Sequence, residues 1–198
     1  MIRYLSTDIT FQEVPGEVSL VFYITGCPRR CPGCHSPELQ QDIGLPLTAQ
    51  IVREYCEKYQ GMFNCVCFMG DGGDFEGIAR LALEAKLQKK AVALYTGAER
   101  QDIPFYLLSL LTFIKVGPYI EARGGLKSPD SNQQFFYLKQ WCDWQNNTYR
   151  FRIEPRELGK PAAVLPDRFD AYAMYDEVDA EGDACEADKP DDPDSPSL

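Results

Sequence analysis

A short stretch of this 198-residue chain, TGCPRRCPGCHSPEL at residues 25–39, gathers three thiols within eight positions: Cys27, Cys31 and Cys34. We call this stretch the cysteine loop. The spacing C-x3-C-x2-C lets all three side chains reach one metal centre from the same loop. Three thiolates suit a four-iron, four-sulfur cluster, because they hold three irons and leave the fourth open to a second molecule. The loop is therefore compatible with a 4Fe-4S cluster that has an open coordination position.

Zinc is the alternative that the same loop leaves open. A structural zinc site usually has four ligands, so a zinc ion here would need His35, Cys65 or Cys67 as the fourth. His35 is the only histidine of the chain. We expect it to pack beside the bound cofactor rather than to bind the metal, since three thiolates already suffice for a cluster.

The cysteines outside the loop are Cys56, Cys65, Cys67, Cys142 and Cys185. The first three fall within predicted helices or strands, where free cysteines usually behave as small apolar side chains. We expect these three to lie in the core. The last two receive no assignment.

The second feature is the stretch GDGGD at residues 70–74, between a predicted strand and a predicted helix. Glycines at such a place let the backbone approach a ligand closely, and the carboxylate of Asp74 at the helix start can face a cationic group. An ordinary tight turn, in which Asp74 caps the helix, suits the same residues. The stretch matches neither a phosphate-binding loop nor the dinucleotide-binding fingerprint.

Strands and helices alternate along the chain and would position these features. Apolar runs predict strands at 19–25, 64–70, 91–95 and 112–116. Helices are predicted over LTAQIVREYCEKYQ with Thr48 as N-cap, over FEGIARLALEAKLQKK after Asp74, and over PFYLLSLL from Pro104. Beyond residue 117 the pattern indicates irregular structure, a short strand, and an edge strand at 148–155.

This alternation is typical of βαβ units and a parallel sheet. In such α/β folds, binding sites form at the carboxyl ends of the strands. The cysteine loop, GDGGD and the YTG of residues 95–97 would all lie at those ends.

Composition and charge indicate one globular domain followed by an acidic tail. The net charge is −10, and most of it comes from the ten acidic residues and one lysine beyond residue 175. We expect a single domain at 1–175 and a disordered tail at 176–198, because the tail has almost no large apolar side chains to bury. The tail is expected to be solubilising, with an electrostatic arm for a basic partner as the alternative.

Several classes of protein are not expected. No stretch approaches the roughly 20 consecutive apolar residues that a membrane span needs. No basic stripe with interleaved aromatic residues indicates a nucleic-acid partner. The N-terminal stretch MIRYLSTDITF lacks the order of a secretory signal, so we expect a cytoplasmic protein whose thiols stay reduced.

These motifs, in this order, resemble one known family. CPRRCPGC after the first predicted strand, GGD after the second, YTG after the third and SPDSNQQFF at 128–136 resemble the anaerobic ribonucleoside-triphosphate reductase activating proteins. That family is a branch of the radical S-adenosylmethionine enzymes, and the resemblance covers roughly residues 1–155. The Pro32-Gly33 pair before Cys34 favours this branch over activases of other glycyl-radical enzymes. Val116 departs from the family, which often has an aspartate before the glycine at this place.

The resemblance implies a fold and a set of site residues. The implied fold is a partial, open parallel α/β barrel of the radical S-adenosylmethionine type. The implied cluster ligands are Cys27, Cys31 and Cys34. The implied contacts of S-adenosylmethionine, whose amino and carboxylate groups bind the fourth iron, are Gly33, Cys34 and His35 along its length and Gly72, Gly73 and Asp74 at its amino end.

The implied activity is that of an oxidoreductase. One electron cleaves S-adenosylmethionine to methionine and a 5'-deoxyadenosyl radical, which removes a hydrogen from a glycine of the reductase. The implied partners are anaerobic ribonucleoside-triphosphate reductase and a low-potential electron donor such as flavodoxin or ferredoxin. Three alternatives stay open: an activase of another glycyl-radical enzyme, a radical enzyme acting on a small molecule, and a non-catalytic zinc or iron-sulfur module.

Overall fold

The computed structural model of the chain describes residues 1–143 and 148–155. The chain divides into two compact units, Met1–Gln140 with Phe151–Val164, and Trp141–Arg150 with Leu165–Leu198. All predicted site residues lie in the first unit. The predicted domain boundary at residue 175 and the predicted tail at 176–198 lie outside the described residues.

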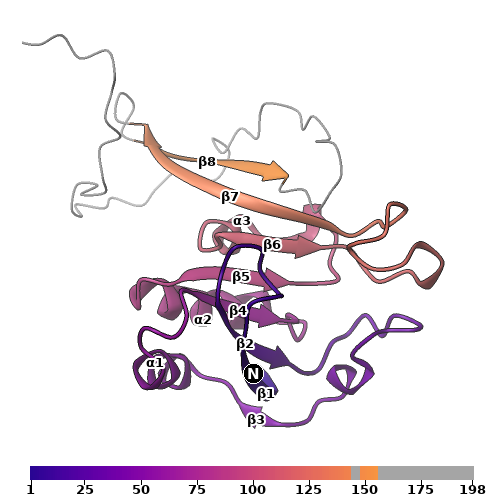
Figure 1. Ribbon diagram of the computed structural model, residues 1–198, viewed down its shortest axis with the longest axis horizontal. Coiled ribbons are helices and arrows are strands. Elements are labelled where there is room, and N and C mark those ends of the chain that lie inside the picture. The colour runs from indigo at the N-terminus through magenta and orange to yellow at the C-terminus, as the bar shows by residue number, and fades with distance from the viewer. Residues whose placement is uncertain (144–147, 156–198) are drawn as a thin grey trace, which may run out of the picture. The chain divides into compact units, whose positions relative to one another are not determined.

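Helices and strands alternate through the middle of the chain (Figure 1). The helices are α1 (Ala49–Lys58), α2 (Phe75–Leu87) and α3 (Phe105–Leu108), with short 3-10 turns η1 (Pro37–Gln40), η2 (Arg100–Asp102) and η3 (Glu121–Arg123). The strands are β1 (Arg3–Thr10), β2 (Ser19–Ile24), β3 (Leu45–Pro46), β4 (Cys65–Met69), β5 (Ala91–Tyr95), β6 (Phe113–Val116), β7 (Gln134–Asp143) and β8 (Thr148–Pro155). The predicted α/β class is therefore confirmed.

The strands form one open, mixed sheet in the order β3-β1-β2-β4-β5-β6-β7-β8 (Figure 1). The four neighbours β2, β4, β5 and β6 run parallel. The prediction of a parallel sheet is confirmed for these four strands. The flanking strands β1, β3 and β7, to which the sequence analysis gives no orientation, pair antiparallel. The connection between β1 and β2 spans only residues 11–18. Parallel pairing needs a crossover of a dozen or more residues, so this connection returns the chain antiparallel.

Helices cover one face of the sheet. The strand register aligns a row of side chains on that face: Phe22, Phe68, Leu94 and Ile114. Each of the four is at most 1% exposed. Tyr55 of α1 packs edge-on against Phe22 with ring centroids 5.4 Å apart, and α2 contacts α1, α3 and β5. This packing fixes the central parallel strands.

The opposite face carries a second apolar cluster that includes the fully buried Cys65 and Cys67. The connection between β1 and β2 covers this face, because Val14 is fully buried in the cluster and the Tyr95 hydroxyl donates a hydrogen bond to the Glu13 carbonyl. Burial raises the pKa of Cys65 to about 12 and raises that of Cys67 well above its usual value. The prediction that these two cysteines are core side chains is confirmed.

The helix starts agree with the sequence, but one helix is shorter than predicted. The Thr48 hydroxyl accepts from the Ile51 amide at the start of α1. The helix predicted over PFYLLSLL ends after one turn at Leu108, because the amides of Leu110 and Leu111 donate to carbonyls three residues back instead of four. Leucines spaced three to four residues apart bury equally well in either kind of turn, so the apolar pattern does not distinguish them.

No helix in the described part of the chain is long and apolar enough to cross a membrane.

Candidate functional site

The three predicted motifs meet at the carboxyl ends of neighbouring parallel strands. The cysteine loop follows β2, GDGGD follows β4 and TG follows β5. The first two motifs touch, because a Cβ atom at Gly73 would lie 3.4 Å from Pro28 Cγ. The sequence therefore predicts correctly that these stretches share one edge of the sheet, the edge at which α/β proteins bind ligands.

The cysteine loop is anchored at its base by backbone hydrogen bonds. The amides of Gly26 and Cys27 donate to the carbonyls of Gln41 and Leu39, at 2.9 and 3.0 Å. The side chain of Leu39 is buried and holds η1 against the fold. The first thiol is thus tied to the returning end of its own loop.

The three thiols are free and half-buried, and they are not arranged as a finished ligand set. Within residues 1–143 and 148–155, no group of three or more histidine, cysteine, aspartate or glutamate side chains is placed to hold a metal ion. A turn in which the Cys34 amide donates to the Cys31 carbonyl at 3.3 Å keeps the second and third thiols on one short segment. The three thiols thus share one loop, but their side chains are not placed to bind a single metal centre.

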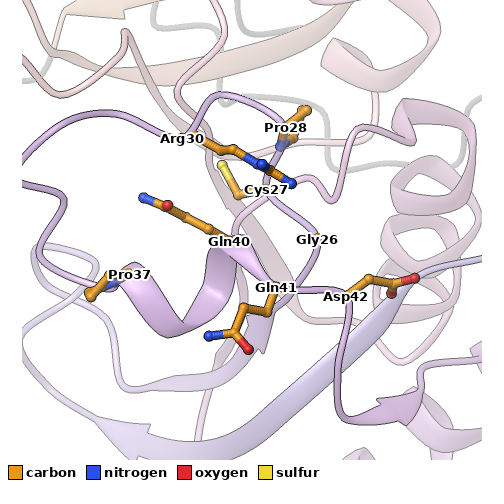
Figure 2. Close-up of a pocket in the computed structure, with 8 residues that line it drawn as sticks. All are labelled: Gly26, Cys27, Pro28, Arg30, Pro37, Gln40, Gln41 and Asp42. Atoms are coloured by element: carbon orange, nitrogen blue, oxygen red, sulfur yellow. The ribbon is translucent and has the colours of Figure 1, made fainter.

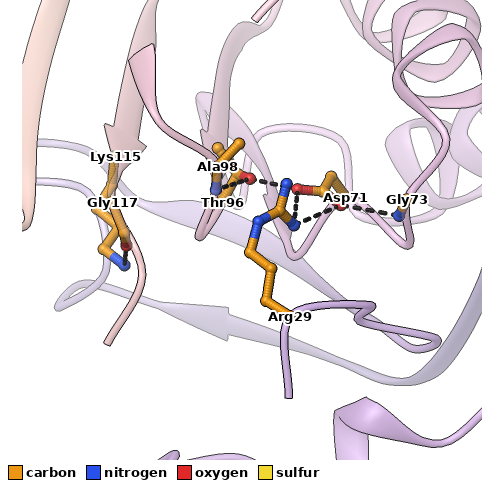
Figure 3. Close-up of polar contacts among 7 residues, drawn as sticks. All are labelled: Arg29, Asp71, Gly73, Thr96, Ala98, Lys115 and Gly117. Atoms are coloured by element: carbon orange, nitrogen blue, oxygen red, sulfur yellow. Dashed lines mark hydrogen bonds and ion pairs between the residues drawn. The ribbon is translucent and has the colours of Figure 1, made fainter. Parts of the chain in front are cut away.

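A cation lies near all three thiols. Lys115 of β6 is half-buried, and its Nζ donates to the Gly117 carbonyl at 3.4 Å (Figure 3). Burial lowers the pKa of Lys115 to about 8, while negative charge on Cys31, Cys34 and Cys27 acts to raise it.

Glycines shape the turn after β4. Gly72 has φ +57°, and a Cβ atom there would lie 3.1 Å from the Thr25 carbonyl oxygen. Asp74 Oδ1 accepts from the Gly77 amide at 2.7 Å and caps α2. The turn therefore packs its backbone closely against the end of β2, and the capping role of Asp74 is confirmed.

The segment after β6 lies beside the last part of the cysteine loop. The exposed ring of His35 packs against Tyr119 with centroids 4.8 Å apart. Gly33 has φ +66°, and a Cβ atom there would lie 3.0 Å from the carboxyl carbon of Glu121. Both residues of the loop thus face a segment to which the sequence analysis gives no role. Their contact with S-adenosylmethionine stays a prediction.

A buried ion pair, which the sequence analysis does not anticipate, joins all three motifs (Figure 3). Arg29 Nη1 donates to both carboxylate oxygens of Asp71, at 3.0 and 2.7 Å, and Asp71 is 1% exposed. The Thr96 hydroxyl and the Gly73 amide also donate to this carboxylate. We call these residues the Arg29–Asp71–Thr96 network. The cysteine loop, GDGGD and YTG each contribute one of its side chains.

Residues beside Thr96 adapt the backbone to this network. The Ala98 amide donates to Thr96 Oγ1 at 2.9 Å, which orients the hydroxyl proton toward Asp71. A Cβ atom at Gly97 would lie only 2.8 Å from Arg29 Cδ, so the glycine leaves the space through which the arginine passes. One sequence signal for the network is that Asp71 follows so soon after a buried strand, since a buried carboxylate needs partners.

A cavity of about 430 Å³ lies between the first half of the cysteine loop and residues 37–42 (Figure 2). Its lining consists of Gly26, Cys27, Pro28, Arg30, Pro37, Gln40, Gln41 and Asp42. Cys27 is the only predicted site residue among them. The cavity therefore borders the site without including the GDGGD turn.

No protein-family model matches this chain, and no curated protein matches it either.

Proposed function

We propose that the chain is a radical S-adenosylmethionine oxidoreductase, built as an open α/β barrel, that generates a glycyl radical on anaerobic ribonucleoside-triphosphate reductase. The observation that supports this most strongly is the meeting of a three-thiol loop, a GDGGD turn and a YTG turn at neighbouring carboxyl ends of β2, β4 and β5. The proposal includes a cytoplasmic location.

The donor chemistry of the loop fits an iron-sulfur cluster. Thiolates are its ordinary ligands, and Cys27, Cys31 and Cys34 are reduced, half-buried and close to the Lys115 ammonium. When bound, such a cluster supplies the electron that splits S-adenosylmethionine into methionine and a 5'-deoxyadenosyl radical, which takes a hydrogen atom from a glycine of the partner. The electron would come from a low-potential donor such as flavodoxin or ferredoxin.

The chain's own residues would bind and orient the cosubstrate. The backbone of Gly72 and Gly73 would approach its amino end, and the Asp74 carboxylate would face the ammonium group. Gly33, Cys34 and His35 would lie along its length. The open sheet leaves one side of the site accessible, which suits a protein loop as substrate better than a small molecule that must be enclosed.

Two observations favour this proposal over a structural zinc site. Cys65 and Cys67, the candidates for a fourth zinc ligand, are fully buried in an apolar cluster, and burial raises both of their pKa values. The remaining candidate, His35, packs against Tyr119. An activase of another glycyl-radical enzyme uses the same site chemistry, so the choice between partner enzymes is left to experiment.

The proposal is tested by reconstituting the full chain anaerobically with iron and sulfide. We expect about four irons per chain and, after reduction, formation of 5'-deoxyadenosine from S-adenosylmethionine. Electron paramagnetic resonance of mixtures with candidate partners should then show a glycyl radical on the reductase. Stoichiometric zinc without iron, or a reduced cluster that leaves S-adenosylmethionine intact, would contradict the proposal. A radical on a different glycyl-radical enzyme would correct the partner alone.

Asp74 is expected to have two separable roles, as helix cap and as a charge for the cosubstrate. Asp74→Ala removes the bond from the Gly77 amide, and such a cap loss costs about 1 kcal/mol. Asp74→Asn keeps a capping oxygen but not the charge. Both variants are expected to weaken binding of S-adenosylmethionine by about tenfold, which corresponds to one lost charge-assisted contact.

Thr48→Ala is the matched control, because Thr48 caps α1 in the same way and lies outside the site. Its unfolding free energy in urea should fall about as much as that of Asp74→Ala, again by about 1 kcal/mol. Its equilibrium binding of S-adenosylmethionine should match that of the unmodified protein. Equal binding by Asp74→Asn and Thr48→Ala would remove Asp74 from the proposed site.

A further inference from the structure

Arg29 occupies the middle of the first cysteine pair. It follows Cys27 by two residues and precedes Cys31 by two. Whatever fixes the direction of this side chain therefore also fixes the backbone between two of the three thiols. Its guanidinium does not turn back to its own loop for a partner but reaches the carboxylate of Asp71 at the end of β4.

The ion pair resists opening because its acidic partner is buried. Asp71 is 1% exposed, and its carboxylate receives hydrogen bonds from Arg29, Thr96 and Gly73. Removing the arginine would leave a buried negative charge without its cation, which is far more costly than breaking an exposed pair. A nearby exposed pair is Arg3 with Asp42, at 3.6 Å and with Asp42 82% exposed. Of the two pairs beside the loop, only the buried one can hold the loop in place.

We infer that Arg29 and Asp71 are positioning residues: their ion pair, supported by Thr96, sets the place of the cysteine loop relative to the GDGGD and YTG turns. The inference rests on the function proposed above, because it gives the loop a fixed distance from the turns that would bind the cosubstrate. Without the pair, the thiols stay on the same loop but are no longer held against the ends of β4 and β5.

The test compares Arg29→Met, Asp71→Asn and the double variant with the unmodified chain. In metal-free protein, amide hydrogen exchange is measured over residues 27–34 and at Gly73. We expect exchange to be about tenfold faster or more in all three variants, because the loop opens locally without global unfolding. Arg29→Lys keeps the charge as a single point and should restore part of the protection.

Arg53→Met is the matched control. Arg53 donates to the buried Glu84 at 2.8 and 2.9 Å, so this variant breaks an equivalent ion pair, between α1 and α2 and away from the loop. Its loop exchange should stay at the level of the unmodified protein. The free energy of unfolding distinguishes a positioning role from a purely stabilising one, because the double variant Arg29→Met/Asp71→Asn has no unpaired buried charge. It should unfold at a higher urea concentration than Arg29→Met, yet its loop should exchange as fast.

A second readout uses the reconstituted protein. The electron paramagnetic resonance signal of the reduced cluster should respond to S-adenosylmethionine in Arg53→Met as it does in the unmodified chain, and less or not at all in Arg29→Met. Equal loop exchange in Arg29→Met and Arg53→Met overturns the inference. Failure of the unmodified chain to take up a cluster overturns the proposed function instead, and the exchange measurement then still decides the role of the ion pair. If Arg29→Met does not fold, the double variant and Arg29→Lys carry the same comparison.

Discussion

Replacing any one of Cys27, Cys31 and Cys34 with alanine is expected to reduce the iron bound after anaerobic reconstitution from about four per chain to below about one. Two remaining thiolates cannot hold three irons, and the described loop offers no further thiol beside them. Cleavage of S-adenosylmethionine should disappear together with the iron. Iron and sulfide analysis and the visible absorption of the reconstituted protein measure the first effect, and formation of 5'-deoxyadenosine measures the second.

Cys56→Ala and Cys67→Ala are the controls for this experiment. Both thiols are buried, Cys56 in α1 and Cys67 in β4. Each variant should keep about four irons per chain. Loss of iron in folded Cys67→Ala would mean that a core thiol is a fourth ligand of the cluster, which would favour the non-catalytic iron-sulfur module. Undiminished iron in all three loop variants would show that the loop does not bind the cluster.

Alkaline pH is expected to destabilise the metal-free protein strongly. Burial raises the pKa values of the Cys65 and Cys67 thiols and of the Tyr95 phenol, so these groups keep their protons in the folded chain. In the unfolded chain the thiols ionise near pH 9 and the phenol near pH 10. Above those values the folded state binds more protons than the unfolded state. Stability therefore falls as pH rises, by about 1.4 kcal/mol per pH unit for each such group.

Lys115 has the opposite effect on the pH dependence of stability. Because burial lowers its pKa to about 8, its cost to folding is complete below that pH and is relieved as pH rises toward the unfolded value of about 10.4. The variant Cys65→Ala/Cys67→Ala isolates the thiols from this effect. Its urea unfolding free energy, measured between about pH 8 and pH 10.5, should fall less steeply than that of the unmodified chain by up to about 2.7 kcal/mol per pH unit. Parallel curves for the two proteins would show that the buried thiols do not govern alkaline stability.

The central strands are the part of the fold that the sequence predicts well. Their runs of buried apolar side chains are bounded by glycine and proline turns, and the predicted ranges differ from β2, β4, β5 and β6 by no more than one residue at either end. The predicted edge strand at 148–155 coincides with β8. Both helix caps, Thr48 and Asp74, also agree with the structure. Burial on both faces of a strand requires a run of apolar residues, and a helix cap requires a particular residue type, so these elements can be predicted from the local sequence.

The flanking strands β1, β3 and β7 cannot be predicted from local sequence in this way. The sequence analysis predicts neither β1 nor β3, because Tyr4 is the only buried residue of β1 and β3 has only two residues, one of them Pro46. β7 is longer than the predicted short strand. These strands exist because a neighbouring strand offers hydrogen-bonding groups, and that is a tertiary effect rather than a local one.

In the candidate site, too, features that follow from local sequence could be predicted and long-range contacts could not. Motifs that end buried strands could be predicted to adjoin, and the structure brings the loop and both turns together. The position of Asp71 after a buried strand indicates that its carboxylate needs a partner, but it does not identify Arg29 as that partner. An arginine between two cysteines has the sequence pattern of an exposed charge, and the two residues are 42 positions apart. Glu121 beside Gly33 is a similar case, since nothing local links the two segments.

The Arg29–Asp71–Thr96 network also constrains the order in which the chain assembles. Arg29 is synthesised 42 residues before Asp71 and still further before Thr96, so its buried partner does not exist until β4 has been made, and the supporting hydroxyl only after β5. Closing a contact over such a separation comes late in folding, because the intervening chain must first be ordered. A newly made chain therefore passes through a stage in which its three thiols are present but the ion pair that holds their loop has not yet formed.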